Sequence, residues 1–300
     1  MRAVLIHNPG AGGEKGSAPD DLIRTLKAAD YEIEIPEPGG GKTAERIRQG
    51  ADLLIAAGGD GTVTYVALNA PSGSTIGILP LGTANNIANS LGIRGKPADI
   101  VAQWPAAEHK TIDIWQARGP WGERNFIEGC GLGALTDAAH HMDDHEITGH
   151  SPDHEISIAR AALMKSLSRG AAVPARLILD DETLEGDFLM LEMLNFSAVG
   201  PRLPLAWSAD PTDGLLEIGY ALADRYNDLC EWLSDGASPW TDAPITLRRA
   251  RSVSLTWRAA RFRIGDAYWP ETGAPEAQAS HTADIRLAGP GPRVLVPRGA

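Results

Sequence analysis

The chain has 300 residues, 43% of them hydrophobic, and its formal net charge at pH 7 is −12. This length and apolar content suffice for about two domains, each with a buried core. The acidic balance argues against a nucleic-acid partner, because neutralising phosphates requires many lysine and arginine contacts. The two cysteines, Cys130 and Cys230, form no CxxC or other metal-ligand spacing. The sequence therefore indicates neither a disulfide framework nor a zinc site.

The N-terminus carries no recognisable targeting signal. The apolar stretch at residues 1–6 is too short for the core of a signal peptide. No apolar run approaches the roughly 20 residues that span a bilayer. We therefore expect a cytoplasmic protein, whose contact with a membrane would be peripheral.

Short apolar runs alternate with helical spacing through the first ninety residues. The expected strands are 3–7, 31–35, 53–57 and 75–79, and the expected helices are 22–28, 43–49, 63–69 and 87–91. Strands that alternate with helices in this way are typical of a parallel sheet covered by helices. The sequence predicts an α/β domain here.

Three of these expected strands end in glycine-rich turns, at residues 8–13, 58–62 and 80–86. Glycine lets the backbone approach a ligand closely, and the first N–H groups of a following helix favour anions. In open α/β sheets, ligands bind beyond the carboxyl ends of the strands. We expect these turns to bind a nucleotide phosphate, with Asp60 acting through a magnesium ion. The alternative is a tight turn in which Asp60 caps a helix.

The ordered motifs resemble those of the diacylglycerol kinase catalytic-domain family, in its bacterial soluble lipid-kinase branch. They are Asn8-Pro9-x-Ala11-Gly12, Gly58-Gly59-Asp60-Gly61-Thr62, Pro80-x-Gly82-Thr83-x-Asn85 with Leu91-Gly92-Ile93, and Asp210-Pro211-x-Asp213-Gly214-x-Leu216. The resemblance implies α/β plus β architecture. A phosphofructokinase-like, Rossmann-like three-layer α/β domain would span 1–113, and an antiparallel β-sandwich that binds lipid would span 114–290. The closing segment 291–300 would pack back near the first domain.

The sequence after Asp113 changes to strands without intervening helices. Residues 110–115 and 124–127 predict a hairpin across the turn at 119–122. Further strands are expected at 175–179, 187–194, 215–221, 245–257 and 260–264. This pattern agrees with an antiparallel second domain.

The resemblance also implies the cofactors, the partners and the site residues. ATP would contact Asn8, Pro9, Gly10, Ala11, Gly12, Gly58, Gly59, Asp60, Gly61, Thr62, Val63, Thr64, Gly82, Thr83 and Asn85. Asp60 and Asp113 would support Mg²⁺ in a network of carboxylates and water. A structural metal would lie at Asp210, Asp213 and the backbone near Leu215. The alternative is an Asx-type turn, because Asp-Pro-x-Asp-Gly also favours a turn without a metal. The substrate would be diacylglycerol or a related lipid, reached by peripheral contact with the inner leaflet, and a homodimer is allowed.

Two departures from the family pattern concern catalysis. Tyr65 stands where family members usually carry glutamate. The family's Asp-Gly-Glu, whose carboxylates activate the lipid hydroxyl, reads Gly265-Asp266-Ala267 in this chain. After a one-residue shift Asp266 would serve as the base, with Glu271 as a fallback. The alternative is that Gly265-Asp266 is only a turn.

Five of the eight histidines lie between residues 140 and 155. The i, i+4 pairs His140 with Asp144, and His141 with His145, fit a metal site on a helix. Because this spacing matches no known metal motif and the segment contains Gly149 and Pro152, we expect a polar loop instead. Residues 156–167 then predict an amphipathic helix, whose apolar side packs in the core or lines a lipid groove.

Four functions remain open from the sequence. The leading hypothesis is a lipid kinase that uses ATP and magnesium. The alternatives are an NAD kinase-like enzyme and a nucleotide-binding regulator that has lost catalysis, as the changes at Tyr65 and Ala267 would suit. A structural protein without a phosphate ligand leaves the three glycine-rich turns unexplained.

Overall fold

The computed structural model describes residues 1–8, 19–37, 41–143, 151–170, 172–235, 243–273, 276 and 278–299. The chain divides into two compact units. The first contains the residues up to Ile112 and those from Pro290 onward, and the second runs from Asp113 to Gly289 except for a short segment before His154. Each unit is described separately below.

The first unit is built on a parallel sheet. Its strands lie in the order β15-β4-β3-β1-β2, and β15 contributes only its last residues, through the pairing of Arg293 and Val294 with β4. The strands are β1 (Arg2–His7), β2 (Glu32–Glu34), β3 (Leu53–Gly58), β4 (Thr75–Pro80) and β15 (Ser280–Val296). Every residue of β3 is buried, as expected for a central strand with both faces covered.

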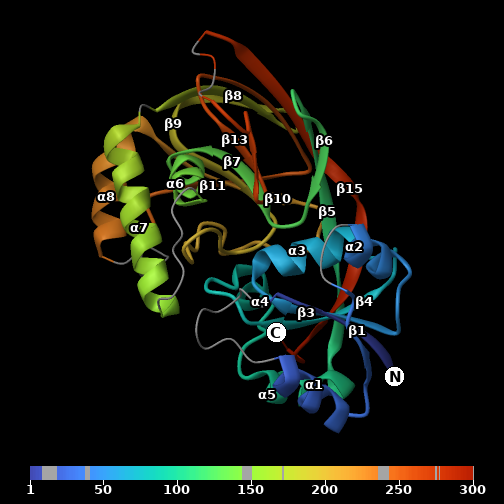
Figure 1. Cartoon of the computed structure of the whole chain (residues 1–300). Helices are drawn as coiled ribbons and strands as arrows, with labels where there is room; N and C mark the ends of the chain where they lie inside the picture. Colours follow the sequence, from blue (N-terminus) through green and yellow to red (C-terminus); the bar gives the residue numbers. More distant parts are fainter. Residues whose placement is uncertain are drawn as a thin grey trace. The chain divides into compact units, whose positions relative to one another are not determined.

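Helices cover both faces of this sheet (Figure 1). Helix α1 packs against α5, and α2 packs against α3. The helices are α1 (Pro19–Ala28), α2 (Gly41–Arg48), α3 (Asp60–Asn69), α4 (Asn86–Ser90), α5 (Pro97–Gln103) and the 3₁₀ turn η2 (Trp104–Ala106). The predicted α/β layer architecture is confirmed, and α5 is a helix that the sequence patterns did not predict.

The second unit is strand-rich, and the strand pairings recorded within it are antiparallel. Its strands are β5 (Glu108–Gly119), β6 (Gly122–Phe126), β7 (Gly129–Gly133), β8 (Val173–Leu179), β9 (Glu182–Leu194), β10 (Leu216–Leu222), β11 (Thr246–Ala250), β12 (Ser252–Arg258), β13 (Phe262–Ile264), β14 (Ala267–Trp269) and most of β15. The hairpin predicted after Asp113 is present as β5 and β6, with Gly119 opposite Gly122. The fold class expected from the sequence is therefore correct for both units.

The expectation of strands without intervening helices was wrong. Helices α6 (Ala134–Asp143), α7 (Pro152–Arg169) and α8 (Tyr226–Ser234) lie between the strands of this unit, and Figure 1 shows α7 next to α8. They are needed because one face of the sheet is apolar and must be covered. Helix α7 agrees with the helix predicted at 156–167, and its buried Leu163 and Leu167 confirm packing in the core.

Strand β9 separates two apolar clusters. Successive side chains of a strand point to opposite faces. Leu191 and Met193 accordingly belong to the cluster formed by the strands, whereas Met190 and Leu194 belong to the cluster covered by α6, α7 and α8. Beyond its own hairpin with β8, β9 pairs with β7 on one side and β10 on the other. It is the central strand of the unit.

Asn195, directly after β9, connects several segments in the interior. Its side chain is fully buried, and its Oδ1 accepts a hydrogen bond from Trp115 Nε1 at 3.1 Å. Its Nδ2 donates to the carbonyl of Ile127 at 2.9 Å and to that of Asp113 at 3.3 Å. Asn195 therefore makes hydrogen bonds to polar groups of three buried residues.

Replacing Asn195 with alanine should destabilise the protein by about 3 kcal/mol, because each buried polar group left unsatisfied costs roughly 1–3 kcal/mol. Urea unfolding followed by tryptophan fluorescence would measure this loss. Asn125, which is exposed on β6, is the matched control, and Asn125→Ala should change stability by less than about 0.5 kcal/mol. Equal effects of the two variants would contradict a bridging role for Asn195.

Candidate functional site

Two of the predicted glycine-rich turns meet at one edge of the first unit's sheet. Strands β3 and β4 are parallel neighbours in a register that places Gly58 opposite Pro80. The amide of Leu81 donates to the carbonyl of Gly58 at 3.0 Å. A Cβ added to Gly82 would lie 2.4 Å from the Cα of Gly59, so the two backbones touch where neither residue carries a side chain. The structure thus brings together two of the three glycine-rich turns that the sequence predicted at strand ends.

The carboxylate of Asp60 ties the two turns together. Its Oδ2 accepts a hydrogen bond from the amide of Asn86, and its Oδ1 accepts one from the amide of Ile87, both at 2.9 Å. These are the first two amides of α4. No side chain caps α3 at Gly59. The capping alternative is therefore correct in kind, but Asp60 caps α4 and not the helix in which it lies.

Other predicted site residues of the two turns make local contacts that shape the backbone. Asn85 adopts a left-handed conformation with φ of 52°, and its side-chain amide exchanges two hydrogen bonds with the peptide groups of Gly82. Val63 is buried in the core of the unit. A Cβ on Gly58 would come within 2.2 Å of Thr62 Oγ1. These residues shape the two turns, and their contact with a phosphate stays a prediction.

The third turn begins at Asn8, whose amide donates to the carbonyl of Ala57 at 3.1 Å. This bond places the end of β1 beside the end of β3. The predicted contacts at Pro9, Gly10, Ala11 and Gly12 lie outside the described residues. Of the third turn, the structure describes only Asn8, and it lies at the same sheet edge as Gly58.

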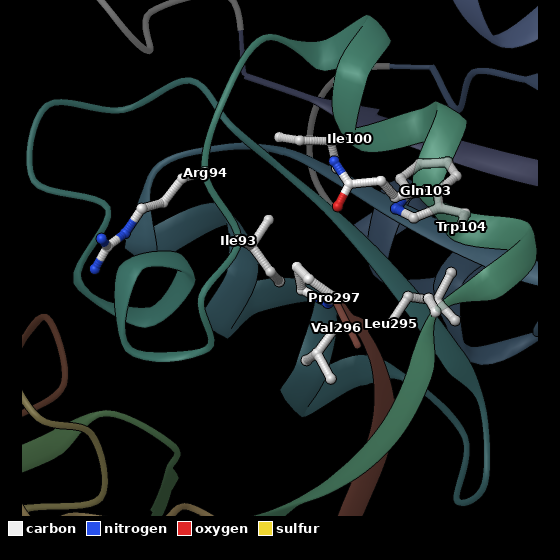
Figure 2. Close-up of a pocket in the computed structure, with 9 residues that line it drawn as sticks. Ile93, Arg94, Ile100, Gln103, Trp104, Leu295, Val296 and Pro297 are labelled. Carbon is white, nitrogen blue, oxygen red and sulfur yellow. The ribbon is translucent and has the colours of Figure 1, made fainter. Parts of the chain in front are cut away.

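Figure 2 shows a small hollow in the first unit, and none of the residues that line it belongs to the three turns. It is lined by apolar side chains that include Ile93, Trp104, Leu295 and Val296. Its free volume is about 10 Å³, which is roughly the space of one water molecule. It is a packing gap between η2 and the end of β15 and is too small for a nucleotide.

Asp113 belongs to the second unit, where it contacts the loop with the predicted metal ligands. Its Oδ2 accepts a hydrogen bond from the amide of Gly214 at 2.8 Å, and its own amide donates to Pro211. Burial raises the pKa of Asp113, and the nearby Asp213 and Asp210 raise it further, against the effect of the Gly214 amide. The prediction that Asp113 and Asp60 support the same Mg²⁺ ion stays a prediction.

The carboxylates of the predicted metal loop are engaged in turn contacts. Asp210 Oδ1 accepts bonds from the amide and the hydroxyl of Thr212, and Asp213 Oδ1 accepts one from the amide of Leu215. Asp213 also pairs with Arg249. Among the described residues, no group of three or more His, Cys, Asp or Glu side chains is arranged to hold a metal ion. These contacts agree with the Asx-turn alternative, and the structural metal stays a prediction.

The candidate base, Asp266, lies at the tip of the hairpin formed by β13 and β14. Ile264 pairs with Ala267, so Gly265 and Asp266 form the turn. Gly265 has φ of 58°, which favours glycine, and Asp266 is exposed. The fallback candidate, Glu271, pairs with Arg124 at 2.8 Å.

The histidine-rich segment is helical where the structure describes it, so the prediction of a polar loop was wrong for those residues. His140 and His141 lie on α6, and Asp153 and His154 lie on α7. The ring of His140 packs on Tyr268 with a centroid distance of 5.1 Å. The partners proposed for a metal at Asp144 and His145 lie outside the described residues.

A buried ion pair near the hairpin was not predicted. Arg263 of β13 donates to Glu192 Oε2 at 2.6 Å. Their side chains are 6% and 0% exposed, and Oε1 of Glu192 has no hydrogen-bond partner among the described residues. A signal for it was present in the sequence, since Glu192 is the one charged residue in the apolar run 188–194.

Comparison with known proteins agrees with these features. Residues 2–117 match the model of the diacylglycerol kinase catalytic domain. A diacylglycerol kinase of Mycobacterium tuberculosis is 31% identical over 244 residues, which cover 76% of this chain and 75% of the relative. The chain belongs to the diacylglycerol kinase family. A diacylglycerol kinase of Staphylococcus saprophyticus is 32% identical over 206 residues, covering 63% of this chain and 62% of that protein.

Solved structures support the fold of this diacylglycerol kinase family member. A crystal structure of a diacylglycerol kinase from Bacillus anthracis superposes with a TM-score of 0.67 at 18% identity, and the match covers 99% of this chain and 97% of the other. At this identity the likeness concerns the fold alone. The expected family and fold are both confirmed.

The close approach of Gly59 and Gly82 leads to a first prediction for this site. Gly82→Ala should lower the melting temperature by several degrees, because the new methyl group would overlap the Gly59 backbone and must push the two turns apart. Gly61→Ala is the control, since a Cβ there meets nothing within 4 Å. Calorimetry of both variants tests the contact, and equal melting temperatures would refute it.

The buried Glu192 leads to a prediction about pH. Burial raises the pKa of Glu192 from 4.5 to about 7, although Arg263 acts in the opposite direction. The folded protein therefore holds this proton more tightly than the unfolded chain does. The resulting stabilisation is complete below about pH 4.5 and is lost as the pH rises to about 7.

Glu192→Gln should therefore flatten the decline in the free energy of unfolding across this pH window, because glutamine does not titrate. Burial also raises the pKa of Asp113, Asp137 and Glu217, so the difference between wild type and variant isolates Glu192. Urea unfolding at several pH values measures the slope. Glu182→Gln removes an exposed carboxylate from the same strand and serves as the control. Parallel curves for wild type and Glu192→Gln would contradict the shift.

Proposed function

We propose that the protein is a lipid kinase that uses ATP and Mg²⁺ to phosphorylate the hydroxyl of diacylglycerol or a related lipid. Membership of the diacylglycerol kinase family supports this proposal. The observation that carries it is the junction of two glycine-rich turns at the ends of β3 and β4, bridged by Asp60. Such an edge suits the phosphates of a nucleotide.

The first unit would bind the nucleotide. Main-chain groups of Gly58 to Thr64 and of Gly82 to Asn85 would surround the phosphates. The glycines of the turns carry no side chains, so a phosphate can approach the backbone closely. Because Asp60 and Asn85 already fix the shape of the turns, little ordering is required when ATP binds.

The donor set of Asp60 fits a magnesium ion bound with ATP. A carboxylate is a hard oxygen ligand, and a carboxylate oxygen has two lone pairs, so it can accept a hydrogen bond from an amide and bind a cation at the same time. Asp60 would hold the ion, directly or through water, while keeping the turn in place. When bound, Mg²⁺ neutralises charge on the transferring phosphoryl group.

The transfer step requires a proton acceptor for the lipid hydroxyl. The hydroxyl oxygen forms a bond to the γ-phosphorus, the bond from that phosphorus to the β,γ-bridging oxygen breaks, and ADP leaves. The hydroxyl proton passes to a carboxylate, which we assign to Asp266 on the β13–β14 turn. The lipid would be reached by peripheral contact with a membrane. No helix in the described part of the chain has the length and apolar character needed to cross one.

A second candidate function is a nucleotide-binding regulator without catalysis. Two observations favour it: Tyr65 is an exposed tyrosine at a position where the family usually has glutamate, and Ala267 follows Asp266 in place of a second carboxylate. Family membership favours a lipid acceptor over the NAD kinase alternative. The assay below separates these three functions.

Purified protein should transfer ³²P from labelled γ-ATP to a lipid in mixed micelles containing Mg²⁺, with diacylglycerol, monoacylglycerol, sphingosine and NAD⁺ tested as acceptors. Asp60→Ala should reduce turnover by about 10³-fold. Removing the carboxylate takes away the hydrogen-bond acceptor of the first α4 amides and also a magnesium ligand. Phosphorylation of NAD⁺ alone would support the NAD kinase alternative. Nucleotide binding without transfer to any acceptor would support the regulator.

Asp266→Asn should lower kcat by about 10²-fold with little change in the affinity for ATP, because it keeps the shape of the side chain but removes the proton acceptor. Glu271→Gln is the matched control and should have a mild effect, since Glu271 is engaged with Arg124 at the surface. Steady-state kinetics with varied ATP and lipid measure both. The reverse pattern would assign the base to Glu271.

A further inference from the structure

The ion pair between Glu192 and Arg263 is linked directly to the turn that carries Asp266. One guanidinium nitrogen of Arg263 donates to Glu192 Oε2 at 2.6 Å, and the other, Nη1, donates to the carbonyl of Gly265 at 2.9 Å. A single side chain therefore connects the central strand β9 to the residue before Asp266. The planar fork of arginine suits this double contact, which the single ammonium group of lysine cannot reproduce.

Strand register aligns the groups in this link. Glu192 pairs laterally with Gly131 of β7, Gly131 pairs with Arg263 of β13, and Arg263 pairs with Tyr268 of β14. A Cβ on Gly131 would lie 2.5 Å from Glu192 Oε2. Glycine at this position therefore makes the room through which Glu192 and Arg263 meet across the intervening strand.

The turn itself is held at two points of its backbone. The amide of Gly265 donates to the carbonyl of Gly129 at 2.9 Å, and its carbonyl accepts from Arg263. Gly265 has positive φ, and the peptide groups on either side of it set the direction in which the chain continues into Asp266. Restraining its carbonyl restrains the start of Asp266.

Stability alone is a weak reason for such a pair. Burying two charges costs several kcal/mol per ion before their attraction repays it, and an apolar pair of similar size is often as stable. Here one oxygen of Glu192 also receives no hydrogen bond from any residue that the structure describes. The arrangement is better explained by the geometry that it imposes on the turn.

We propose that Arg263, held by Glu192, is a positioning residue for phosphoryl transfer, because it fixes the peptide of Gly265 and thereby the carboxylate of Asp266. The inference rests on the proposed function, in which Asp266 accepts the proton of the lipid hydroxyl. Proton transfer requires the carboxylate within about 3 Å of the hydroxyl, so a loosened turn lowers the rate without weakening nucleotide binding.

Arg263→Lys tests this role, because it keeps a positive charge beside Glu192 but cannot hold both partners. Its kcat should fall by about 10-fold to 100-fold, while KM for ATP stays within about twofold. Added to Asp266→Asn, it should cause no further loss, because its effect acts through Asp266. A multiplied loss in the double variant would show a separate structural effect and overturn the proposal.

Hydrogen–deuterium exchange provides a measurement that does not depend on activity. The amides of residues 262–269 should exchange faster in Arg263→Lys than in wild type. Arg261→Lys is the matched control: Arg261 is nearly as buried, but it donates to the carbonyls of Pro270 and Gly273 beyond the hairpin. It should leave exchange at the Gly265 turn and kcat close to wild type.

If Arg263→Lys does not fold, the double variant Glu192→Met with Arg263→Met takes its place, because it removes both charges together and keeps the volume. The same lower kcat and faster exchange are expected. Unchanged exchange and kcat in an active enzyme would overturn the positioning role alone. A wild type that phosphorylates no lipid would instead overturn the proposed function, and the positioning role with it.

Discussion

The contact between Gly59 and Gly82 is the constraint on which the first unit's site depends. Parallel pairing brings the ends of β3 and β4 to one edge, and the absence of two side chains lets the turns that follow touch there. Once they touch, Asp60 reaches the first amides of α4 and fixes the entry to that helix. Each turn thus completes the other, which explains why both are glycine-rich although they are about twenty residues apart.

The α/β unit could be predicted from the sequence because its information is local. A fully buried parallel strand reads as a continuous apolar run, and a strand that ends at a ligand edge is followed at once by glycine. The stretch 53–62 shows both features within ten residues. The role of Asp60 could not be predicted in detail, because its hydrogen-bond partners lie 26 and 27 residues further along the chain.

The strand-rich unit was less predictable because its glycines are used differently. Strand β7 has the sequence Gly-Cys-Gly-Leu-Gly, which locally indicates a turn, yet every residue in it is buried between β9 and β13. Helices α6 and α8 cover an apolar face that exists only after distant strands have paired. Glu192 and Arg263 are 71 residues apart. The sequence shows a charged residue in each apolar strand, but it does not show that the two form an ion pair.

The missing glutamate and the unpredicted ion pair concern the same hairpin, and the two observations are connected. The family's Asp-Gly-Glu places two carboxylates around one glycine, whereas this chain has only Asp266 beside Gly265. A turn with two carboxylates can offer an acceptor in more than one orientation, but a turn with one carboxylate must hold it in a single place. On the proposal that Asp266 is the base, the loss at Ala267 increases the need for a fixed turn. Arg263 supplies that restraint from the interior, where salt screens its bond to Glu192 much less than it would at the surface.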